Sequence, residues 1–360
     1  MISEHFPARR SANVIPAQGA HLLDEASLFS YLADHIEGFS WPAALWQFQG
    51  GQSNPTYLIE TGERAYVLRK KPPGILLPSA HQIDREYKIQ SALRNTAVPV
   101  AQMLHFCSDV SIIGTEFYVM AYLEGRIQHD PMLSEFRTDE RAEVQAQMFQ
   151  TLGALHAVDY TALGLADYGR PEHYIARQIK RWRKQYESIA TEELSDMVRL
   201  MDWLERNIPA RDESTIVHGD FRLGNMMLHP DEPRLTAVLD WELSTLGHPL
   251  ADLAYSCMVF HLPQMPGSTH SGYSGLDLSA LGMLTETECL EIYCRGYGRS
   301  GIPDWNFHLG FAMFRAAAIA EGVYVRALAG NAADASGIEL HKMTKLSAAC
   351  GWDIIKNSGV

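Results

Sequence analysis

Three side chains that carry oxygen ligands stand at short spacings in the second half of the sequence. Asp220 lies just after an apolar run at 215–217, Asn225 comes five positions later, and Asp240 comes twenty positions later. Phosphoryl transfer requires such a set, because one carboxylate must orient the attacking hydroxyl while oxygen ligands hold Mg²⁺ on the phosphates of ATP. The spacing therefore indicates phosphoryl-transfer chemistry.

Short β-rich segments must position these side chains. The pattern predicts strands at 215–218, 226–229 and 235–239, with a turn at 230–233 between the last two. A strand that ends before Asp220 and a hairpin that ends before Asp240 would place both carboxylates on loops.

The sequence of this segment resembles the motif of a known family. His-Gly-Asp-Phe-Arg-Leu-Gly-Asn at 218–225, followed by Val-Leu-Asp at 238–240, is similar to the catalytic segment of the aminoglycoside phosphotransferase and choline kinase group, whose fold is similar to that of protein kinases. The run at 240–254 looks most like the phosphotransferase-like domains found alone in bacteria or fused to acyl-CoA dehydrogenases. The resemblance covers nearly the entire chain.

This resemblance implies roles for four residues. Asp220 would be the catalytic base, Asn225 and Asp240 would be metal ligands, and His218 would organise the catalytic loop. The implied activity is an ATP-dependent phosphotransferase that moves the γ-phosphate to a hydroxyl of a small molecule, with ATP and Mg²⁺ between two lobes.

The first third of the chain reads as a small sheet-rich lobe. We expect a helix over 24–36, a hairpin of strands at 56–59 and 65–69, a helix over 81–93 and a strand at 116–120.

The remainder of the chain is mostly helical, apart from the short strands already described. We therefore predict an α+β, protein-kinase-like two-lobed fold, with a β-rich N-terminal lobe over 1–122 and a larger helical C-terminal lobe over 123–360. Helices are expected at 138–158, 172–189, 192–207, 249–260, 285–297 and 305–328.

A nucleotide site of the implied kind requires a glycine-containing turn. Residues 50–54 read Gly-Gly-Gln-Ser-Asn, and small residues let backbone N–H groups approach phosphates. Gly51, Ser53 and Asn54 are the residues expected there.

The site also requires a cation on a strand and an acid on a helix. Arg69 ends the second strand of the hairpin, and Glu86 lies 17 residues later on the predicted helix. Lys70 and Lys71 follow at once, but strand alternation favours Arg69 or Lys71 over Lys70. We predict an Arg69–Glu86 ion pair.

The apolar strand that closes the first lobe leads into Glu124 and Gly125. Its backbone is expected to bind an adenine edge around Met120 and Tyr122.

Composition restricts the functional class. The 30 Lys and Arg against 43 Asp and Glu give a net charge of −13, which disfavours a nucleic-acid partner. No apolar run is long enough for a membrane span, and the first thirty residues lack the apolar core of a secretory signal. Five cysteines without a C-x-x-C pair argue against disulfides and structural zinc, so we expect a reducing cytoplasm.

Two further acidic residues lie near the motif. Asp252 is expected to hold the catalytic loop through backbone hydrogen bonds, and Glu242 could touch a second metal, touch the substrate or pair with a basic neighbour. The G-x-G-x-x-G pattern at 296–301 follows a helical pattern rather than a strand, which predicts a helix C-cap rather than a dinucleotide site.

Two other functions remain open. His218, Asp220, His229, Asp240 and His248 could form the metal cluster of a hydrolase, although this leaves the first lobe without a role. The chain could also be a nucleotide-binding regulator without catalysis, although such a protein has no need of an intact catalytic set.

The acceptor is the remaining question. An aminoglycoside, an amino alcohol or a hydroxyacyl compound each fits the family resemblance, and the acidic net charge favours a cationic acceptor at long range. The segment at 261–279, rich in Pro, Gly and Ser, is a candidate substrate lid beside the acceptor.

Overall fold

The computed structural model of the chain describes residues 13–49, 54–72, 81–265, 271–328 and 340–357. The chain separates into two compact units. Unit 1 takes its described residues from Met1–Asn95, Pro99–Glu124 and Asp240–Glu242, and unit 2 takes them from Thr96–Val98, Gly125–Leu239 and Leu243–Val360. The sequence suggested one cut between 122 and 123, whereas the short segment Asp240–Glu242 returns to unit 1.

Unit 1 is built on an antiparallel sheet whose described strands run in the order β1-β2-β3-β4-β6-β5. The predicted hairpin is present, because β3 pairs with β4 residue by residue. The pattern did not reveal β2 or β5. The elements are β1 (Val14–Ile15), η1 (Gly19–His21), α1 (Glu25–His35), β2 (Ala43–Phe48), β3 (Thr56–Thr61), β4 (Ala65–Lys70), α2 (Ile83–Leu93), β5 (Met103–Cys107) and β6 (Phe117–Ala121).

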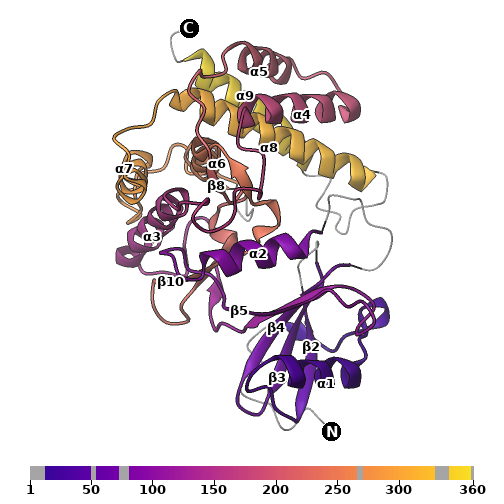
Figure 1. The fold of residues 1–360 in the computed structure, drawn as a ribbon. Coiled ribbons are helices and arrows are strands. Elements are labelled where there is room, and N and C mark those ends of the chain that lie inside the picture. The colour runs from indigo at the N-terminus through magenta and orange to yellow at the C-terminus, as the bar shows by residue number, and fades with distance from the viewer. Residues whose placement is uncertain (1–12, 50–53, 73–80, 266–270, 329–339, 358–360) are drawn as a thin grey trace. The chain divides into compact units, whose positions relative to one another are not determined.

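The sheet of unit 1 packs its core against α1, which lies beside it in Figure 1. The carboxylate of Asp24 caps α1 by accepting a hydrogen bond from the backbone of Ser27 at 3.1 Å. Leu68 of β4 belongs to the α1 core. Since neighbouring side chains of a strand point to opposite faces, Arg69 points to the other face of the sheet.

Unit 2 is mostly helical and also carries two small sheets, β10-β9-β7 and β11-β8. Its predicted helices are present with small shifts at their ends. The elements are β7 (Arg126–Ile127), α3 (Thr138–His156), α4 (Tyr174–Ile189), α5 (Ser195–Arg206), β8 (Thr215–Val217), η2 (Leu223–Asn225), β9 (Met226–Leu228), β10 (Leu235–Val238), η3 (Trp241–Leu243, which begins in unit 1), β11 (Thr245–Gly247), α6 (Pro249–His261), α7 (Glu286–Tyr297), α8 (Trp305–Leu328) and α9 (Leu340–Lys356).

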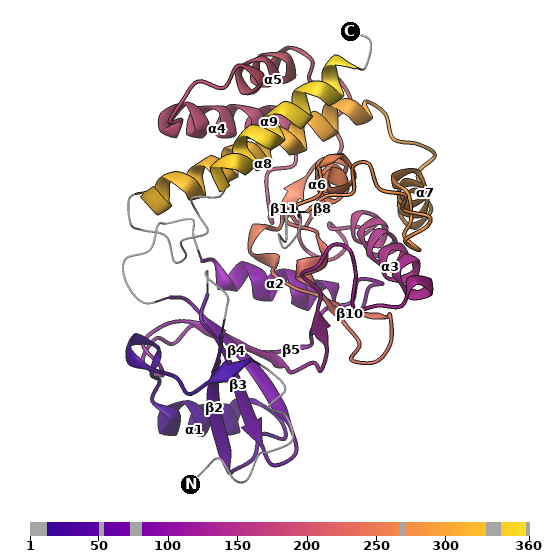
Figure 2. The ribbon, with the colours of Figure 1, turned by 180° about the vertical axis from the view of Figure 1, so that it is seen from behind.

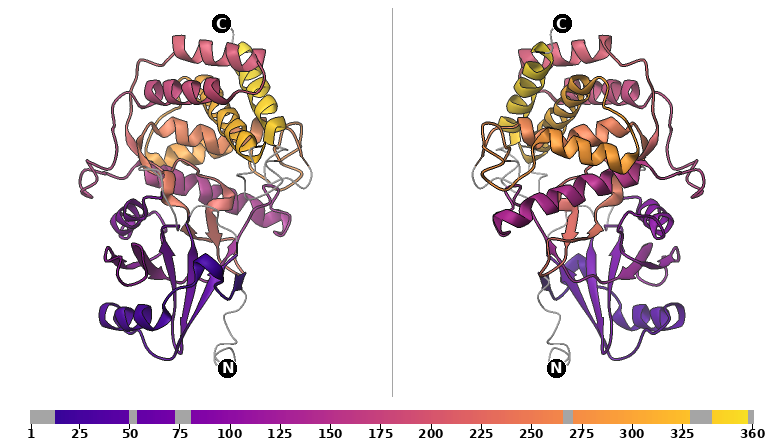
Figure 3. Two further views of the ribbon diagram at one scale, coloured as in Figure 1. Left: turned by 90° about the vertical axis from the view of Figure 1, so that its right-hand side faces the viewer. Right: turned by 90° about the vertical axis from the view of Figure 1, so that its left-hand side faces the viewer.

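The main core of unit 2 lies among α4, α5, α8 and α9. Figures 1 and 2 show α9 lying along α8, and Figure 3 shows α4 and α5 stacked against this pair. The sequence analysis did not predict α9. Small residues permit the close packing, because a Cβ at Gly351 of α9 would lie 2.9 Å from the Cβ of Met313 in α8.

No helix among the described residues has both the length and the apolar character needed to cross a membrane. Charged residues interrupt the longest of them, α8, as the sequence indicated.

Candidate active site

One face of α6 holds the loop that contains Asp220. The carboxylate of Asp252 accepts hydrogen bonds from the backbone nitrogens of the two residues that precede Asp220, the hydroxyl of Tyr255 donates to Asp220 itself, and the hydroxyl of Ser256 donates to the carbonyl of Phe221 at 2.7 Å. The three α6 residues occupy positions i, i+3 and i+4, which share one face of a helix. Four consecutive loop residues are therefore fixed by one helix.

The predicted function of Asp252 is confirmed in detail. Its Oδ2 lies 2.7 Å from the nitrogen of His218, and its Oδ1 lies 2.9 Å from the nitrogen of Gly219. Burial alone would raise the pKa of Asp252, but the hydrogen bond and charge of His156 and the contacts of His218 lower it overall. Asp252 is thus a buried anion that holds the loop.

His218 connects the two parts of the motif inside unit 2. Its Nδ1 accepts a hydrogen bond from the backbone nitrogen of Asp220 at 3.3 Å, which leaves Nε2 as the donor to the carbonyl of Leu239 at 2.8 Å. Leu239 directly precedes Asp240. The ring is fully buried, so its contacts are those of a loop organiser.

Gly219 takes a backbone conformation that disfavours other residues. Its φ is +88°, and a Cβ would lie 2.9 Å from the carbonyl oxygen of Leu243. The turn that presents Asp220 therefore depends on a glycine at this position.

Asp220 and Asn225 are in direct contact, as their spacing suggested. The Asn225 amide donates to Oδ2 of Asp220 at 2.7 Å and to the backbone carbonyl of Asp220 at 2.8 Å. Nε of Arg222 lies 3.5 Å from Oδ1 of the same carboxylate. Asp220 is therefore surrounded by donors and by one cation.

In unit 1, the predicted ion pair between Arg69 and Glu86 is present. Nε of Arg69 lies 3.2 Å from Oε2 of Glu86, and its terminal nitrogen Nη2 lies 3.3 Å from Asp240 and 3.8 Å from Glu242. Burial opposes the charge of Arg69, but Tyr118 and the three carboxylates outweigh it and raise the pKa of Arg69 overall. Glu242 is therefore seen pairing with a basic neighbour.

The neighbouring lysine has a different partner. Lys71 pairs with Glu116, so Arg69 is the cation that reaches the helix acid. Burial raises the pKa of Glu86 to about 7, against the opposite effects of Arg69 and the Tyr118 hydroxyl. The pair thus occupies a well-shielded site, in which the Glu86 side chain is almost fully buried.

The other predicted nucleotide residues have mixed outcomes. Gly51 and Ser53 lie outside the described residues. The side chain of Asn54 is buried and donates to Glu86 at 2.9 Å, while its amide oxygen lies 3.0 Å from Nδ1 of His81. The Asn54 side chain therefore supports the ion pair.

At the end of β6, backbone pairing occupies part of the predicted adenine-binding strand. Met120 pairs with Val67 and Met103 in the sheet, and the nitrogen of Tyr122 donates to the carbonyl of Ala65 at 3.2 Å. The backbone nitrogen of Tyr122 is therefore already engaged within unit 1.

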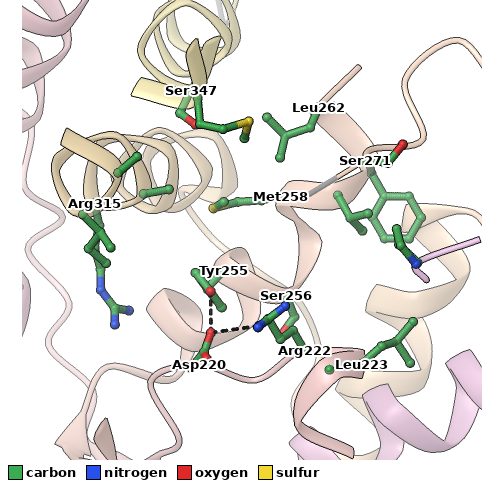
Figure 4. A pocket seen from close by; sticks show the side chains of 18 of the residues that line it. Asp220, Arg222, Leu223, Tyr255, Ser256, Met258, Leu262, Ser271, Arg315 and Ser347 are labelled. Atoms are coloured by element: carbon green, nitrogen blue, oxygen red, sulfur yellow. Dashed lines mark hydrogen bonds and ion pairs between the residues drawn. The ribbon is translucent and has the colours of Figure 1, made fainter. Parts of the chain in front are cut away.

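A pocket of about 380 Å³ lies within unit 2, and Asp220 is in its wall (Figure 4). Among the described residues that line it, Asp220 is the only carboxylate, whereas Arg222 and Arg315 contribute positive charge. Most of the remaining wall is apolar and comes from α3, α6, α8, α9 and the loops: Met148, Phe149, Leu223, Met258, Val259, Phe260, Leu262, Ile319, Val323, Leu340 and Met343.

Part of the candidate lid segment forms the wall of this pocket. Tyr273 is buried, its nitrogen donates to the carbonyl of Val259 at 2.7 Å, and its hydroxyl donates to the carbonyl of Pro131 at 2.6 Å. Residues 266–270 lie outside the described part of the chain. The described part near Tyr273 is packed against its neighbours.

Two competing patterns have structural explanations. Gly298 ends α7 with φ +79°, so the G-x-G-x-x-G pattern is a helix C-cap, as predicted. Within the described ranges, no group of three or more His, Cys, Asp or Glu side chains could hold a metal ion, and His248 instead caps α6. The hydrolase cluster therefore has no support in these residues.

Sequence reasoning missed Tyr255, Ser256 and Arg315. Tyr255 and Ser256 lie in a run that reads as an apolar helix, and Arg315 lies within the long helix α8, yet its guanidinium donates to the carbonyl of Gly219 at 2.7 Å. The i, i+3, i+4 spacing from Asp252 was the available signal for the first two.

Two curated proteins that are longer than this chain contain segments similar to it. Acyl-CoA dehydrogenase family member 10 of Mus musculus is 44% identical over 93% of this chain, and family member 11 of Homo sapiens is 43% identical over 89% of it. The chain spans only 31% of the first protein and 41% of the second.

Solved structures give the fold. A candidate aminoglycoside phosphotransferase from Ralstonia eutropha is 43% identical, with a TM-score of 0.86 over 93% of this chain and 99% of that one. Choline kinase of Cryptosporidium parvum is 10% identical, with a TM-score of 0.60 over 93% of this chain and 96% of that one. The fold is therefore kinase-like, with a β-sheet N-terminal part and a helical C-terminal part.

The family follows from the sequence profile together with this motif geometry. The profile of the phosphotransferase enzyme family matches residues 45–308, which include Arg69, Glu86 and the complete segment from His218 to Asp252. The chain therefore belongs to the phosphotransferase enzyme family.

Proposed function

We propose that this chain transfers the γ-phosphate of ATP to a hydroxyl of a small molecule with a largely apolar body, and that Asp220 is the catalytic base. The observation that carries this proposal is the position of Asp220 in the wall of the apolar pocket. A hydroxyl compound in that pocket can present its O–H to the one carboxylate of the described lining.

The chemical step balances with Asp220 as base. The acceptor oxygen bonds to the γ-phosphorus, the hydroxyl proton passes to Asp220, and the bond from the γ-phosphorus to the β–γ bridging oxygen breaks, so that ADP leaves. Arg222, beside Asp220, offers positive charge to the transferring phosphoryl group.

The side-chain chemistry of Asn225 in unit 2 and of Asp240 in unit 1 suits Mg²⁺. Because the amide nitrogen of Asn225 is already turned to Asp220, its carbonyl oxygen is left as an acceptor, and Asp240 adds a carboxylate. Mg²⁺ usually takes one or two protein carboxylates plus substrate phosphates, which needs no preformed cluster of acids. The ion would neutralise charge on the phosphates.

On the unit 1 side, Arg69 is the residue we assign to the nucleotide phosphates. It already carries three carboxylates at ion-pair distance, and phosphate oxygens are alternative partners for a guanidinium. Glu86 would keep Arg69 in place. Gly51 and Ser53 would contact the phosphates. The backbone from Met120 through Tyr122 to Leu123 would contact the adenine.

The pocket favours a hydroxyacyl compound over an aminoglycoside. A polycationic aminoglycoside needs several carboxylates, whereas the described lining offers only Asp220 and adds Arg222 and Arg315. An acyl chain would instead bury apolar surface, at about 25 cal/mol per Å². The curated relatives, which also carry acyl-CoA dehydrogenase names, support this choice.

A substrate screen tests the proposal. ADP release is measured with ATP and Mg²⁺ over hydroxyacyl compounds, amino alcohols and aminoglycosides, with D220N as the control. We expect turnover with a hydroxyacyl compound that D220N abolishes. Preference for an aminoglycoside would overturn the acceptor class, and nucleotide binding without turnover on any acceptor would favour a regulator.

A further inference from the structure

Both oxygens of the Asp220 carboxylate are held from inside unit 2. Oδ2 accepts from the amide of Asn225 at 2.7 Å, and Oδ1 accepts from the hydroxyl of Tyr255. Figure 4 shows Tyr255 reaching down from its helix to Asp220 at the edge of the pocket. Asn225 belongs to the motif, but Tyr255 has no role in the proposed reaction.

Tyr255 is itself firmly placed. It lies one helical turn after Asp252, which holds the backbone of the same loop, and its ring faces the guanidinium of Arg315 at 5.6 Å. Arg315 also donates to the carbonyl of Gly219. Asp252 and Arg315 thus hold the backbone of the loop, while Tyr255 holds the side chain of Asp220.

The charge state of Tyr255 suits a permanent donor. Burial and the negative charge of Asp220 raise the pKa of the Tyr255 hydroxyl well above its ordinary value. The hydroxyl therefore keeps its proton and cannot compete with Asp220 for the proton of an acceptor.

The geometry points to Tyr255 as a positioning residue for the catalytic base, which fixes the rotation of the Asp220 carboxylate toward the acceptor pocket. This inference rests on the proposed role of Asp220. The terminal torsion of an aspartate is broad, so an unrestrained carboxylate samples many orientations. Tyr255 and Asn225 bind different oxygens, which selects one orientation; Arg222 also lies beside Oδ1, so the second lone pair of Oδ2 is the one left for the acceptor.

A merely structural tyrosine would behave differently, and the chain offers a matched control. Tyr57 of β3 is also buried, but it lies in the α1 core of unit 1, and its hydroxyl donates to the backbone carbonyl of His21 at 2.8 Å instead of to Asp220. Removing either hydroxyl deletes one hydrogen bond of a buried tyrosine. Only the change at Tyr255 releases the carboxylate.

The kinetic experiment compares Y255F with Y57F in the full chain. For the acceptor found in the ADP-release screen, we expect kcat of Y255F to fall about tenfold or more, because catalysis depends on the orientation of the base. KM for ATP and Tm should match those of Y57F, whose kcat stays within about twofold of wild type. Equal losses of kcat in both variants, or none in Y255F, would overturn the inference.

A second measurement does not depend on any acceptor. In a crystal structure of Y255F we expect the Asp220 carboxylate to be rotated or to occupy more than one orientation, whereas Y57F keeps the wild-type orientation. An unmoved carboxylate in Y255F would overturn the role of Tyr255. Absence of turnover by the wild-type enzyme on all acceptors would instead refute the proposed function, so the two failures are distinguishable.

Discussion

The two units hold their functional charges in opposite ways. In unit 1, the cation Arg69 is surrounded by carboxylates at 3.2 to 3.8 Å. In unit 2, the carboxylate of Asp220 is surrounded by the neutral donors of Tyr255 and Asn225, with the Arg222 guanidinium at 3.5 Å. The first arrangement consists of ion pairs and the second mostly of hydrogen bonds.

This difference separates the kinds of ligand that each unit can take. A triphosphate can replace carboxylates around Arg69, because both present anionic oxygens to the same guanidinium. At Asp220 the donors need not leave, because each carboxylate oxygen accepts more than one hydrogen bond. We therefore expect unit 1 to bind by exchange of ionic partners and unit 2 to bind an acceptor at a site that is already oriented.

The most severe test replaces the base itself. Asp220→Asn keeps the size of the side chain and its contact with Asn225, but it removes the basic oxygen, so we expect kcat for phosphoryl transfer to fall about 100-fold or more. Affinity for ATP and Mg²⁺, measured by calorimetry, should stay near the wild-type value. Substantial residual turnover would remove Asp220 from its assigned role.

A large effect on stability is expected from Asp252→Asn. The amide can accept from only one of the two backbone nitrogens now bonded and turns its own N–H groups toward the other, so we expect a loss of about 3 kcal/mol in the free energy of unfolding. Asp139→Asn is the control, since Asp139 is exposed and pairs only at the surface. Chemical denaturation measures both.

The pH dependence of the same variant has a definite sign. The folded state lowers the pKa of Asp252 below its ordinary value of 3.8, so this carboxylate stabilises the fold above that pH. The contribution is lost as pH falls through the lowered pKa. The difference between wild type and D252N should thus be full at neutral pH and shrink in strong acid, and a constant difference would contradict this electrostatic explanation.

The sequence predicted those contacts of the site that follow from short spacings along the chain. Asp220 and Asn225 share one loop, and Arg69 faces Glu86 because strand alternation and helix spacing determine both directions. The loop-holding role of Asp252 was also predictable, since it begins an apolar helix after the motif.

Tertiary packing determines the acceptor pocket and the position of α9, which the sequence did not predict. The acceptor pocket combines α3, α6, α8 and α9, and no spacing rule relates Phe149 to Met343. The net charge of −13 suggested a cationic acceptor, but the charged side chains among the described residues of the pocket wall are Asp220, Arg222 and Arg315, which net charge cannot reveal. Helix α9 was missed although its buried residues lie on the core of unit 2.

A smaller effect than that of the base is expected from the cation of unit 1. Arg69→Met removes the proposed phosphate partner and also leaves Glu86 buried without its counter-ion, so we expect ATP affinity to fall about tenfold to 100-fold, as for a lost charged hydrogen bond. Lys71→Met is the matched control, because Lys71 pairs with Glu116 instead. Calorimetric titration with ATP and Mg²⁺ distinguishes them, and equal losses would mean that no single cation carries the phosphate contact.

The mildest perturbation, added salt, separates the two units without a mutation. Ions screen charges over about 10 Å at 0.1 M and about 3 Å at 1 M, so exchange of ionic partners at Arg69 should weaken with salt. An acceptor held by apolar contacts and by hydrogen bonds to a fixed carboxylate should be much less affected. Raising NaCl from about 0.1 M to about 1 M should therefore raise KM for ATP several-fold and change KM for the acceptor by less than about twofold. A parallel rise of both KM values would show that the acceptor is also bound through charge, and Arg222 and Arg315 would then be the residues to substitute next.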